Sequence, residues 1–121
     1  MNIIYSELLK LPGICHAFST RTDGYSSSPW DSLNCSKFVG DKEKNVVENR
    51  KKIFSMLDFE DSIQIKQVHG INVIKAENFL NTDMPIQADA IITQLKGLAV
   101  SVTVADCAPI LFVNPKLKIV A

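Results

Sequence analysis

The sequence is poor in cysteine, and the few that it has are badly placed for a disulfide framework. Cys15, Cys35 and Cys107 are odd in number and contain no Cys-x-x-Cys pair. Small secreted domains instead carry even, closely spaced sets of cysteines. The N-terminus also lacks the basic region and long apolar region of a signal peptide. These absences favour a cytoplasmic protein with reduced thiols.

The chain also lacks an excess charge and a long apolar run. Its 13 basic and 13 acidic residues balance, so nothing in the net charge predicts binding to nucleic acid or to an anionic membrane. No apolar run approaches the roughly 18 to 20 residues that a membrane helix needs. What remains is an ordinary composition, 46% hydrophobic in 121 residues, which is typical of one globular domain.

Hydrophobic spacing predicts one helix, from about residue 43 to residue 57. Asp41 is placed to cap its first turn. An apolar stripe recurs at helical spacing, formed by Val46, Val47, Arg50, Ile53, Phe54 and Leu57. Upstream, residues 22–32 are almost all turn formers and predict a long loop, a kind of segment that often carries function.

The second half of the chain predicts strands. Residues 62–68 alternate, and residues 72–76 follow a turn at Gly70, so these two segments could pair as a hairpin. Four further strands are expected at 88–93, 98–104, 110–113 and 117–120, which are rich in Val and Ile. A helix followed by many strands predicts an α+β fold with mixed sheets packed against helices. The chain ends on an apolar run, and we expect it to be truncated before the C-terminal part of its fold.

Two residues at the ends of predicted strands have the chemistry of zinc ligands. His69 precedes the Gly70 turn, and Cys107 lies between two apolar segments. Catalytic zinc usually has three protein ligands and an open position at which water is activated. Spacing alone favours simpler roles, a turn histidine bonded to backbone and a small buried thiol. Asp106, beside Cys107, is a candidate hydrogen-bond partner for a metal-bound histidine.

Motifs spread over the chain strengthen the metal-site hypothesis. They occupy residues 16–21, 24–26, 32–34, 40–41, 48–50, 67–70, 88–93 and 103–111. In this order they resemble the YfiH-like family, also described as laccase-domain or purine nucleoside phosphorylase YfiH-like proteins. The resemblance predicts that residues 1–121 are the N-terminal portion of a single YfiH-like domain.

The resemblance implies that His69 and Cys107 are metal-binding and catalytic residues. The family's third ligand belongs to an Ala-His-Ala-Gly-Trp-Arg-Gly motif, which does not occur in this chain. Zn²⁺ is the implied cofactor, with copper as a possible substitute. The implied partners are a purine nucleoside (adenosine, inosine, guanosine or methylthioadenosine) and phosphate, with neither nucleic acid nor membrane.

The implied activity is phosphorolysis of purine nucleosides, with adenosine deamination as a second activity. Arg21 and Asn34 flank the predicted loop and are candidate substrate contacts, because an Arg fork fits phosphate and an Asn amide fits a base or ribose. The alternative for Arg21 is a surface salt bridge to Asp23 or Asp31. Cys15 and Cys35 are interpreted as small apolar residues, and His16 as structural.

Three other functions compete with phosphorolysis. In a thiol hydrolase, His69 would activate Cys107 as a nucleophile. A copper polyphenol oxidase is less compatible with a chain that contains two histidines, since multicopper sites use many. An inactive truncated domain is the third alternative, and we expect the 121-residue chain to be poorly stable alone.

Overall fold

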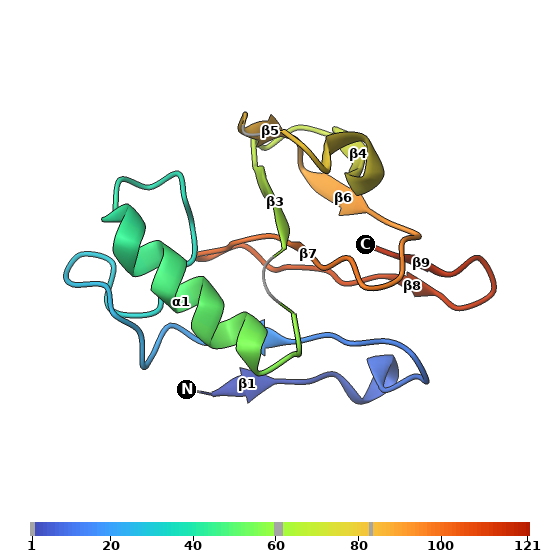
Figure 1. Ribbon diagram of the computed structural model, residues 1–121, viewed down its shortest axis with the longest axis horizontal. Helices are drawn as coiled ribbons and strands as arrows, with labels where there is room; N and C mark the ends of the chain where they lie inside the picture. Colours follow the sequence, from blue (N-terminus) through green and yellow to red (C-terminus); the bar gives the residue numbers. More distant parts are fainter. Residues whose placement is uncertain (1, 60–61, 83) are drawn as a thin grey trace. The chain divides into compact units, whose positions relative to one another are not determined.

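The computed structural model describes residues 2–59, 62–82 and 84–121, which form two compact units, residues 1–61 and 62–121. The first unit holds β1 (Ile3–Ile4), the short 3-10 helix η1 (Glu7–Leu9), β2 (Phe18–Ser19) and α1 (Glu43–Ser55). The second holds β3 (Ile63–Lys66), β4 (Val73–Lys75), η2 (Ala76–Phe79), β5 (Ile86–Gln87), β6 (Ala90–Ile92), β7 (Val100–Ser101), β8 (Val113–Asn114) and β9 (Ile119–Val120). Figure 1 traces these elements along the chain. One α-helix with several small sheets confirms the α+β class.

Helix α1 confirms the predicted helix and ends two residues before its predicted end. Its buried side is the predicted stripe, including Val46, Arg50, Ile53 and Phe54, although Val47 is exposed. The buried Arg50 guanidinium lies over the Phe54 ring, 5.4 Å from its centre, so a charged residue is accommodated in the stripe by an aromatic face.

The predicted Asp41 cap is wrong. The N-cap position is Lys42, and no side chain caps the helix. The Asp41 carboxylate instead accepts hydrogen bonds from Ser26 Oγ at 2.6 Å and Asn34 Nδ2 at 3.0 Å. Those two bonds, from Asn34 first and then Ser26, hold the pKa of Asp41 below its ordinary value of 3.8. Asp41 also accepts the Lys42 amide at 2.7 Å, so it links the preceding loop to the start of the helix without capping it.

The long loop predicted at residues 22–32 is confirmed, and one helical side chain organises it. Asn49 is fully buried. Its Nδ2 donates to Ser26 Oγ at 2.9 Å, to the Asn34 carbonyl at 2.8 Å and to the Ser32 carbonyl at 3.2 Å. Its Oδ1 accepts the Tyr25 amide at 2.8 Å. Buried backbone groups need hydrogen-bond partners. The Asn49 side chain supplies partners that a helix or a sheet would otherwise provide to this part of the loop.

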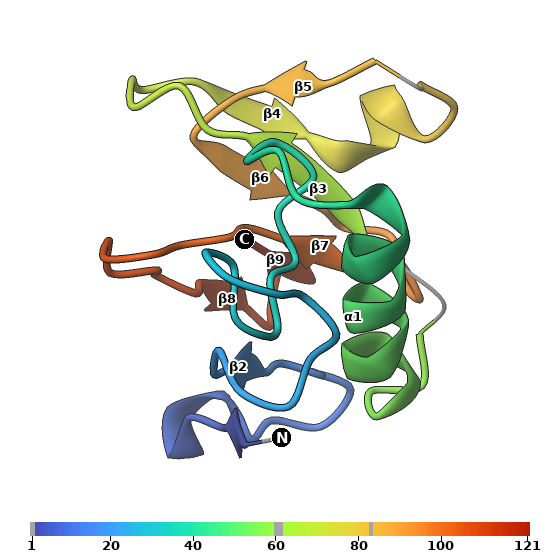
Figure 2. The ribbon, with the colours of Figure 1, turned by 90° about the vertical axis from the view of Figure 1, so that its left-hand side faces the viewer.

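Parallel pairing dominates the second unit and overturns the predicted hairpin. β3 pairs in parallel with both β5 and β7, and β4 pairs in parallel with β6. β3 and β4 therefore belong to different sheets. Figure 2 gives a second view of these strands. A core of Ile65, Ala76, Ala88 and Ile91 lies between them. Burial of Ile65 and Ile91 against this core selects the parallel partners over the neighbouring strand.

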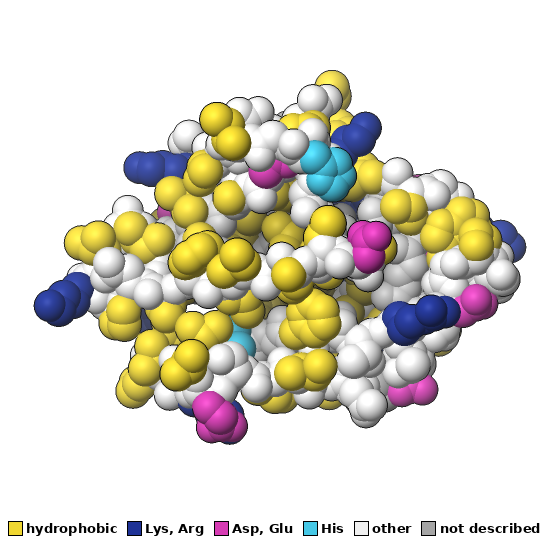
Figure 3. Space-filling view, turned by 180° about the vertical axis from the view of Figure 1, so that it is seen from behind, with side chains coloured by type: hydrophobic (Ala, Val, Ile, Leu, Met, Phe, Trp, Pro, Cys, Tyr) yellow, Lys and Arg dark blue, Asp and Glu magenta, His cyan; other side chains and the backbone are white. Residues whose placement is uncertain are grey.

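The C-terminal strands are shorter than predicted. Strand β6 confirms the middle of 88–93, and β7 and β9 lie within 98–104 and 117–120. The segment predicted at 110–113 is strand only at Val113, where antiparallel β8 pairs with β9. Ile110 and Phe112 are 67% and 63% exposed. Hydrophobic side chains are prominent on the face drawn in Figure 3.

No helix in the described part of the chain is long and apolar enough to cross a membrane.

Candidate functional site

His69 lies in the turn between β3 and β4, and its backbone has an unusual conformation. Its φ is +59°, in the left-handed region that non-glycine residues seldom adopt. The residue is exposed. Among the described residues, no hydrogen bond engages its imidazole. The prediction of a turn histidine is correct, whereas the expected hydrogen bond from its ring to backbone is absent among the described residues.

Asp89, between β5 and β6, holds this turn from the other side. Its Oδ1 accepts the Val68 amide at 3.0 Å and its Oδ2 accepts the Asn72 amide at 3.4 Å. Burial acts to raise the pKa of Asp89, but hydrogen bonds from the amides of residues 68, 70, 72 and 69 outweigh it and hold that pKa below 3.8. The backbone of the turn that carries His69 is thus hydrogen-bonded to the Asp89 carboxylate.

Cys107 lies in the irregular segment between β7 and β8. Its thiol is free and exposed, so the interpretation of Cys107 as a small buried residue is wrong. Asp106 Oδ1 is 4.0 Å from the Cys107 Sγ. An exposed thiol in an irregular loop is available to a metal or an electrophile, whereas a core thiol is not.

The two donors fit zinc in their chemistry, although they are fewer than a complete site requires. Imidazole nitrogen and thiolate sulfur are common zinc ligands, and both side chains are exposed in the same unit. Within the residues that the structure describes, no group of three or more His, Cys, Asp or Glu side chains could hold a metal ion. The metal site therefore stays a prediction, with His69 and Cys107 as two of its ligands.

Arg21 and Asn34, the predicted substrate contacts, both lie in the first unit. Arg21 Nε donates to the Asp31 carbonyl oxygen at 3.1 Å, a contact with backbone rather than the suggested salt bridge. Asn34 donates to the Asp41 carboxylate and accepts the Ser36 amide at 3.0 Å. Both side chains therefore help to shape the loop, and their contact with substrate remains a prediction.

The other His and Cys residues lie in different environments: His16 and Cys35 differ from the candidate ligands, whereas Cys15 is a free, exposed thiol like Cys107. His16 Nε2 accepts the Ser6 amide at 2.8 Å, and its ring meets Tyr5 edge-on, which is a structural role as predicted. Burial raises the pKa of the Cys35 thiol to about 11, against a smaller opposite effect of Arg50. Cys15 is exposed, and its interpretation as a small apolar residue stays a prediction.

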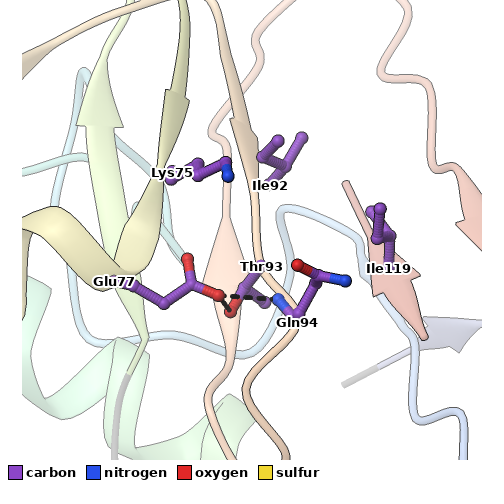
Figure 4. Close-up of a pocket in the computed structure, with 6 residues that line it drawn as sticks. All are labelled: Lys75, Glu77, Ile92, Thr93, Gln94 and Ile119. Atoms are coloured by element: carbon purple, nitrogen blue, oxygen red, sulfur yellow. Dashed lines mark hydrogen bonds between the residues drawn. The ribbon is translucent and has the colours of Figure 1, made fainter. Parts of the chain in front are cut away.

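A small pocket lies at the carboxyl end of the β4–β6 pair, whereas the His69 turn lies at its amino end. Figure 4 shows its lining, formed by Lys75, Glu77, Ile92, Thr93, Gln94 and Ile119. Glu77 Oε1 accepts the Thr93 hydroxyl at 2.9 Å and the Gln94 amide at 2.7 Å. The cavity is about 70 Å³, enough for one or two waters and too small for a nucleoside.

Sequence reasoning missed Asp89 and Asn49 as organising residues. Each lies inside a recognised motif, at residues 88–93 and 48–50. The available signal was a polar residue within an otherwise apolar or helical pattern, since a buried polar group needs hydrogen-bond partners.

Residues 15–121 match the family described as multi-copper polyphenol oxidoreductase laccase. The chain belongs to this laccase-domain family. Purine nucleoside phosphorylase of Deinococcus radiodurans is 32% identical to the laccase-domain chain over 119 residues, which is 93% of the chain and 44% of the relative. Purine nucleoside phosphorylase YfiH of Escherichia coli is 36% identical over 105 residues, covering 84% of the chain and 42% of the relative.

Solved structures give the same picture of the laccase-domain chain. The crystal structure of YlmD from Geobacillus stearothermophilus superposes with a TM-score of 0.74 and 29% identity. That of the hypothetical protein YfiH from Bacillus licheniformis gives 0.76 and 29%. Each match covers 86% of this chain and 42% of the other. The chain thus spans less than half the length of these relatives.

Proposed function

We propose that this protein is a zinc-dependent purine nucleoside phosphorylase in which His69 and Cys107 are metal ligands. One observation carries the proposal: an imidazole free of hydrogen bonds among the described residues and a free thiol are both exposed on irregular segments of one unit. The names of the relatives from Deinococcus radiodurans and Escherichia coli support this reaction. The third protein ligand would come from outside residues 1–121.

The proposed roles follow from the chemistry of each side chain. Zinc, when bound, supplies Lewis acidity and activates water near neutral pH. His69 would bind it through a ring nitrogen, and Cys107 would bind it as a thiolate. Arg21 would hold phosphate through guanidinium N–H groups other than the Nε–H that bonds to the Asp31 carbonyl, and Asn34 would hold the ribose or base. Adenosine, inosine, guanosine and methylthioadenosine are the proposed substrates, and the cytoplasm is the proposed location.

The experiment compares matched variants of the intact protein. His69→Ala and Cys107→Ser should each lower bound zinc, measured by mass spectrometry, and reduce phosphate-dependent release of base at least 100-fold. His16→Ala and Cys15→Ser change the same residue types at positions that are not proposed as ligands, and both variants should retain zinc. Normal zinc content and turnover in either ligand variant would reject the assignment.

The same preparations test the competing activities. Conversion of adenosine to inosine without phosphate would add deamination, which zinc-activated water can perform at a purine carbon. Metal-free wild type that iodoacetamide inactivates at Cys107 would indicate a thiol hydrolase. The family description makes copper the other metal to test. Copper-dependent oxygen uptake with a phenol, in the absence of phosphorolysis, would identify an oxidase instead.

A further inference from the structure

We propose that Asp89 is the positioning residue for His69, and that its carboxylate fixes the turn which presents the imidazole. The inference deepens the proposed function and rests on it for the role of His69. Asp89 itself lies beyond the turn, directly before β6, 20 positions from His69 along the chain.

The contacts place Asp89 across the whole turn. Its two carboxylate oxygens accept amides on either side of His69, from Val68 at 3.0 Å and Asn72 at 3.4 Å. Its own amide donates to the Asn72 carbonyl at 2.8 Å, and the amide of Ala90 donates to the same oxygen at 3.0 Å. The side chain and the backbone amide of Asp89 therefore both hydrogen-bond to the same turn, an arrangement called the grip of Asp89 below.

The conformation of the turn explains why such a grip is needed. His69 has φ +59°, which an L-residue keeps only when its surroundings compensate for the strain. Amides that converge on one carboxylate provide that compensation, because each bond to a charged acceptor is stronger than a neutral one. Releasing the carboxylate would let the turn relax toward negative φ and redirect the imidazole.

Gly70 makes room for this arrangement. A Cβ added at Gly70 would lie 3.3 Å from Asp89 Oδ2, closer than ordinary van der Waals contact. A side chain at this position would therefore push the carboxylate away from the turn. This contact gives a second way to disturb the grip without changing Asp89.

Asp89 is a positioning residue rather than a catalytic one. Its two oxygens accept backbone amides of the turn, so its contacts in the structure are with the segment that carries His69. Residues that orient a metal ligand typically change metal affinity 10- to 100-fold when they are replaced. This range sets the expected effect.

The test measures zinc affinity and amide exchange in the intact protein. Asp89→Ala should weaken zinc binding 10- to 100-fold in competition with a chromophoric chelator. The amides of Val68 and Asn72 should exchange with deuterium at least tenfold faster in zinc-free protein. Asp89→Asn, which keeps one acceptor oxygen, should fall between Asp89→Ala and wild type. Gly70→Ala should change both readouts in the same direction as Asp89→Ala.

Glu77→Gln is the matched control. Glu77 also ties backbone and side chain together through a carboxylate, at the opposite end of the β4–β6 pair. This variant should leave zinc affinity and the exchange of Val68 and Asn72 within twofold of wild type. If it lowers zinc affinity as much as Asp89→Ala does, general destabilisation is responsible and the proposal is overturned.

The two readouts separate failure of this inference from failure of the proposed function. Wild type that binds no zinc refutes the metal site, yet faster exchange in Asp89→Ala would still support the grip on the turn. Unchanged zinc affinity in folded Asp89→Asn and Gly70→Ala would overturn the positioning role. If Asp89→Ala does not fold, these two milder variants decide the result.

Discussion

Replacing Asn49 by alanine should destabilise the first unit far more than its single lost side chain suggests. The Asn49 amide lies at full burial and makes four hydrogen bonds, three as donor and one as acceptor. Three of its partners are backbone groups of the loop, from Tyr25, Ser32 and Asn34. Alanine offers none of these bonds. The Ser32 carbonyl would keep the Ser26 amide and Ser26 Oγ would keep the Asp41 carboxylate, whereas the Tyr25 amide and the Asn34 carbonyl have no second hydrogen bond among the described residues.

The magnitude follows from the number of groups that lose a partner. Two Nδ2 hydrogens serve three acceptors, so the side chain contributes about three full hydrogen bonds. Each is worth about 1 kcal/mol net, and a buried group left unsatisfied costs about 1 to 3 kcal/mol. The free energy of unfolding should therefore fall by about 3 to 4 kcal/mol, which is near the upper end for a single substitution.

Native-state hydrogen exchange of the intact protein at increasing urea concentration measures the change, followed through the backbone amides of helix α1. Asn45→Ala is the matched control on the same helix. It removes the same atoms from a half-buried position. The hydrogen bond from Asn45 lowers the pKa of Asp41 less than the bonds from Asn34, Ser26 and the Lys42 amide do. That variant should cost about 1 kcal/mol or less. A loss below 1 kcal/mol for Asn49→Ala, equal to the control, would refute the role of Asn49 as organiser of the loop.

Three further results are expected. Burial raises the pKa of Cys35 to about 11, whereas Cys15 and Cys107 are exposed. Iodoacetamide should therefore label Cys35 at least tenfold more slowly than the other two cysteines at pH 8, as measured by peptide mass spectrometry. Equal labelling of the three would contradict the burial of Cys35. Hydrogen bonds from Asn34 and Ser26 lower the pKa of Asp41 from 3.8, so its contribution to stability is complete above that value and is lost as the pH falls through the lower, folded value. Asp41→Asn should then flatten the acid unfolding curve below about pH 4, and an unchanged curve would exclude this linkage. Three large apolar side chains are 57% to 67% exposed, those of Ile110, Phe112 and Leu117. The 121-residue chain alone should therefore bind a hydrophobic dye and lack a cooperative melt above room temperature. A sharp melt without dye binding would count against this expectation.

The sequence predicted the parts of the fold that depend on local pattern. Helix α1 was recognisable because its apolar residues repeat at helical spacing, and the loop before it because turn-forming residues follow one another. Asp41 was misjudged because other donors compete with the helix amides for its carboxylate. Its carboxylate binds Ser26 and Asn34 instead, and those partners become neighbours only after the loop has folded.

Strand pairing was less accessible because it depends on contacts between distant segments. Residues 62–68 and 72–76 are close in sequence and separated by a glycine turn, which favours a hairpin. The structure pairs β3 with β5 and β7, and β4 with β6. These parallel pairs bury Ile65 and Ile91 together. Tertiary burial thus overrides the local turn signal, and no short-range pattern contains that information.

Zinc-ligand candidates were recognisable by their chemistry, whereas the residues that support the loops were not. Asp89 and Asn49 are both polar residues whose partners are backbone amides or carbonyls of another segment. Such a role produces no periodic pattern in the sequence. The shared motifs nevertheless contain them beside the candidate ligands. A motif residue is therefore as apt to support a loop as to bind metal, and loss of activity on mutation does not distinguish the two roles. Zinc affinity measured beside local amide exchange does, because replacing a ligand leaves the turn intact while replacing its support does not.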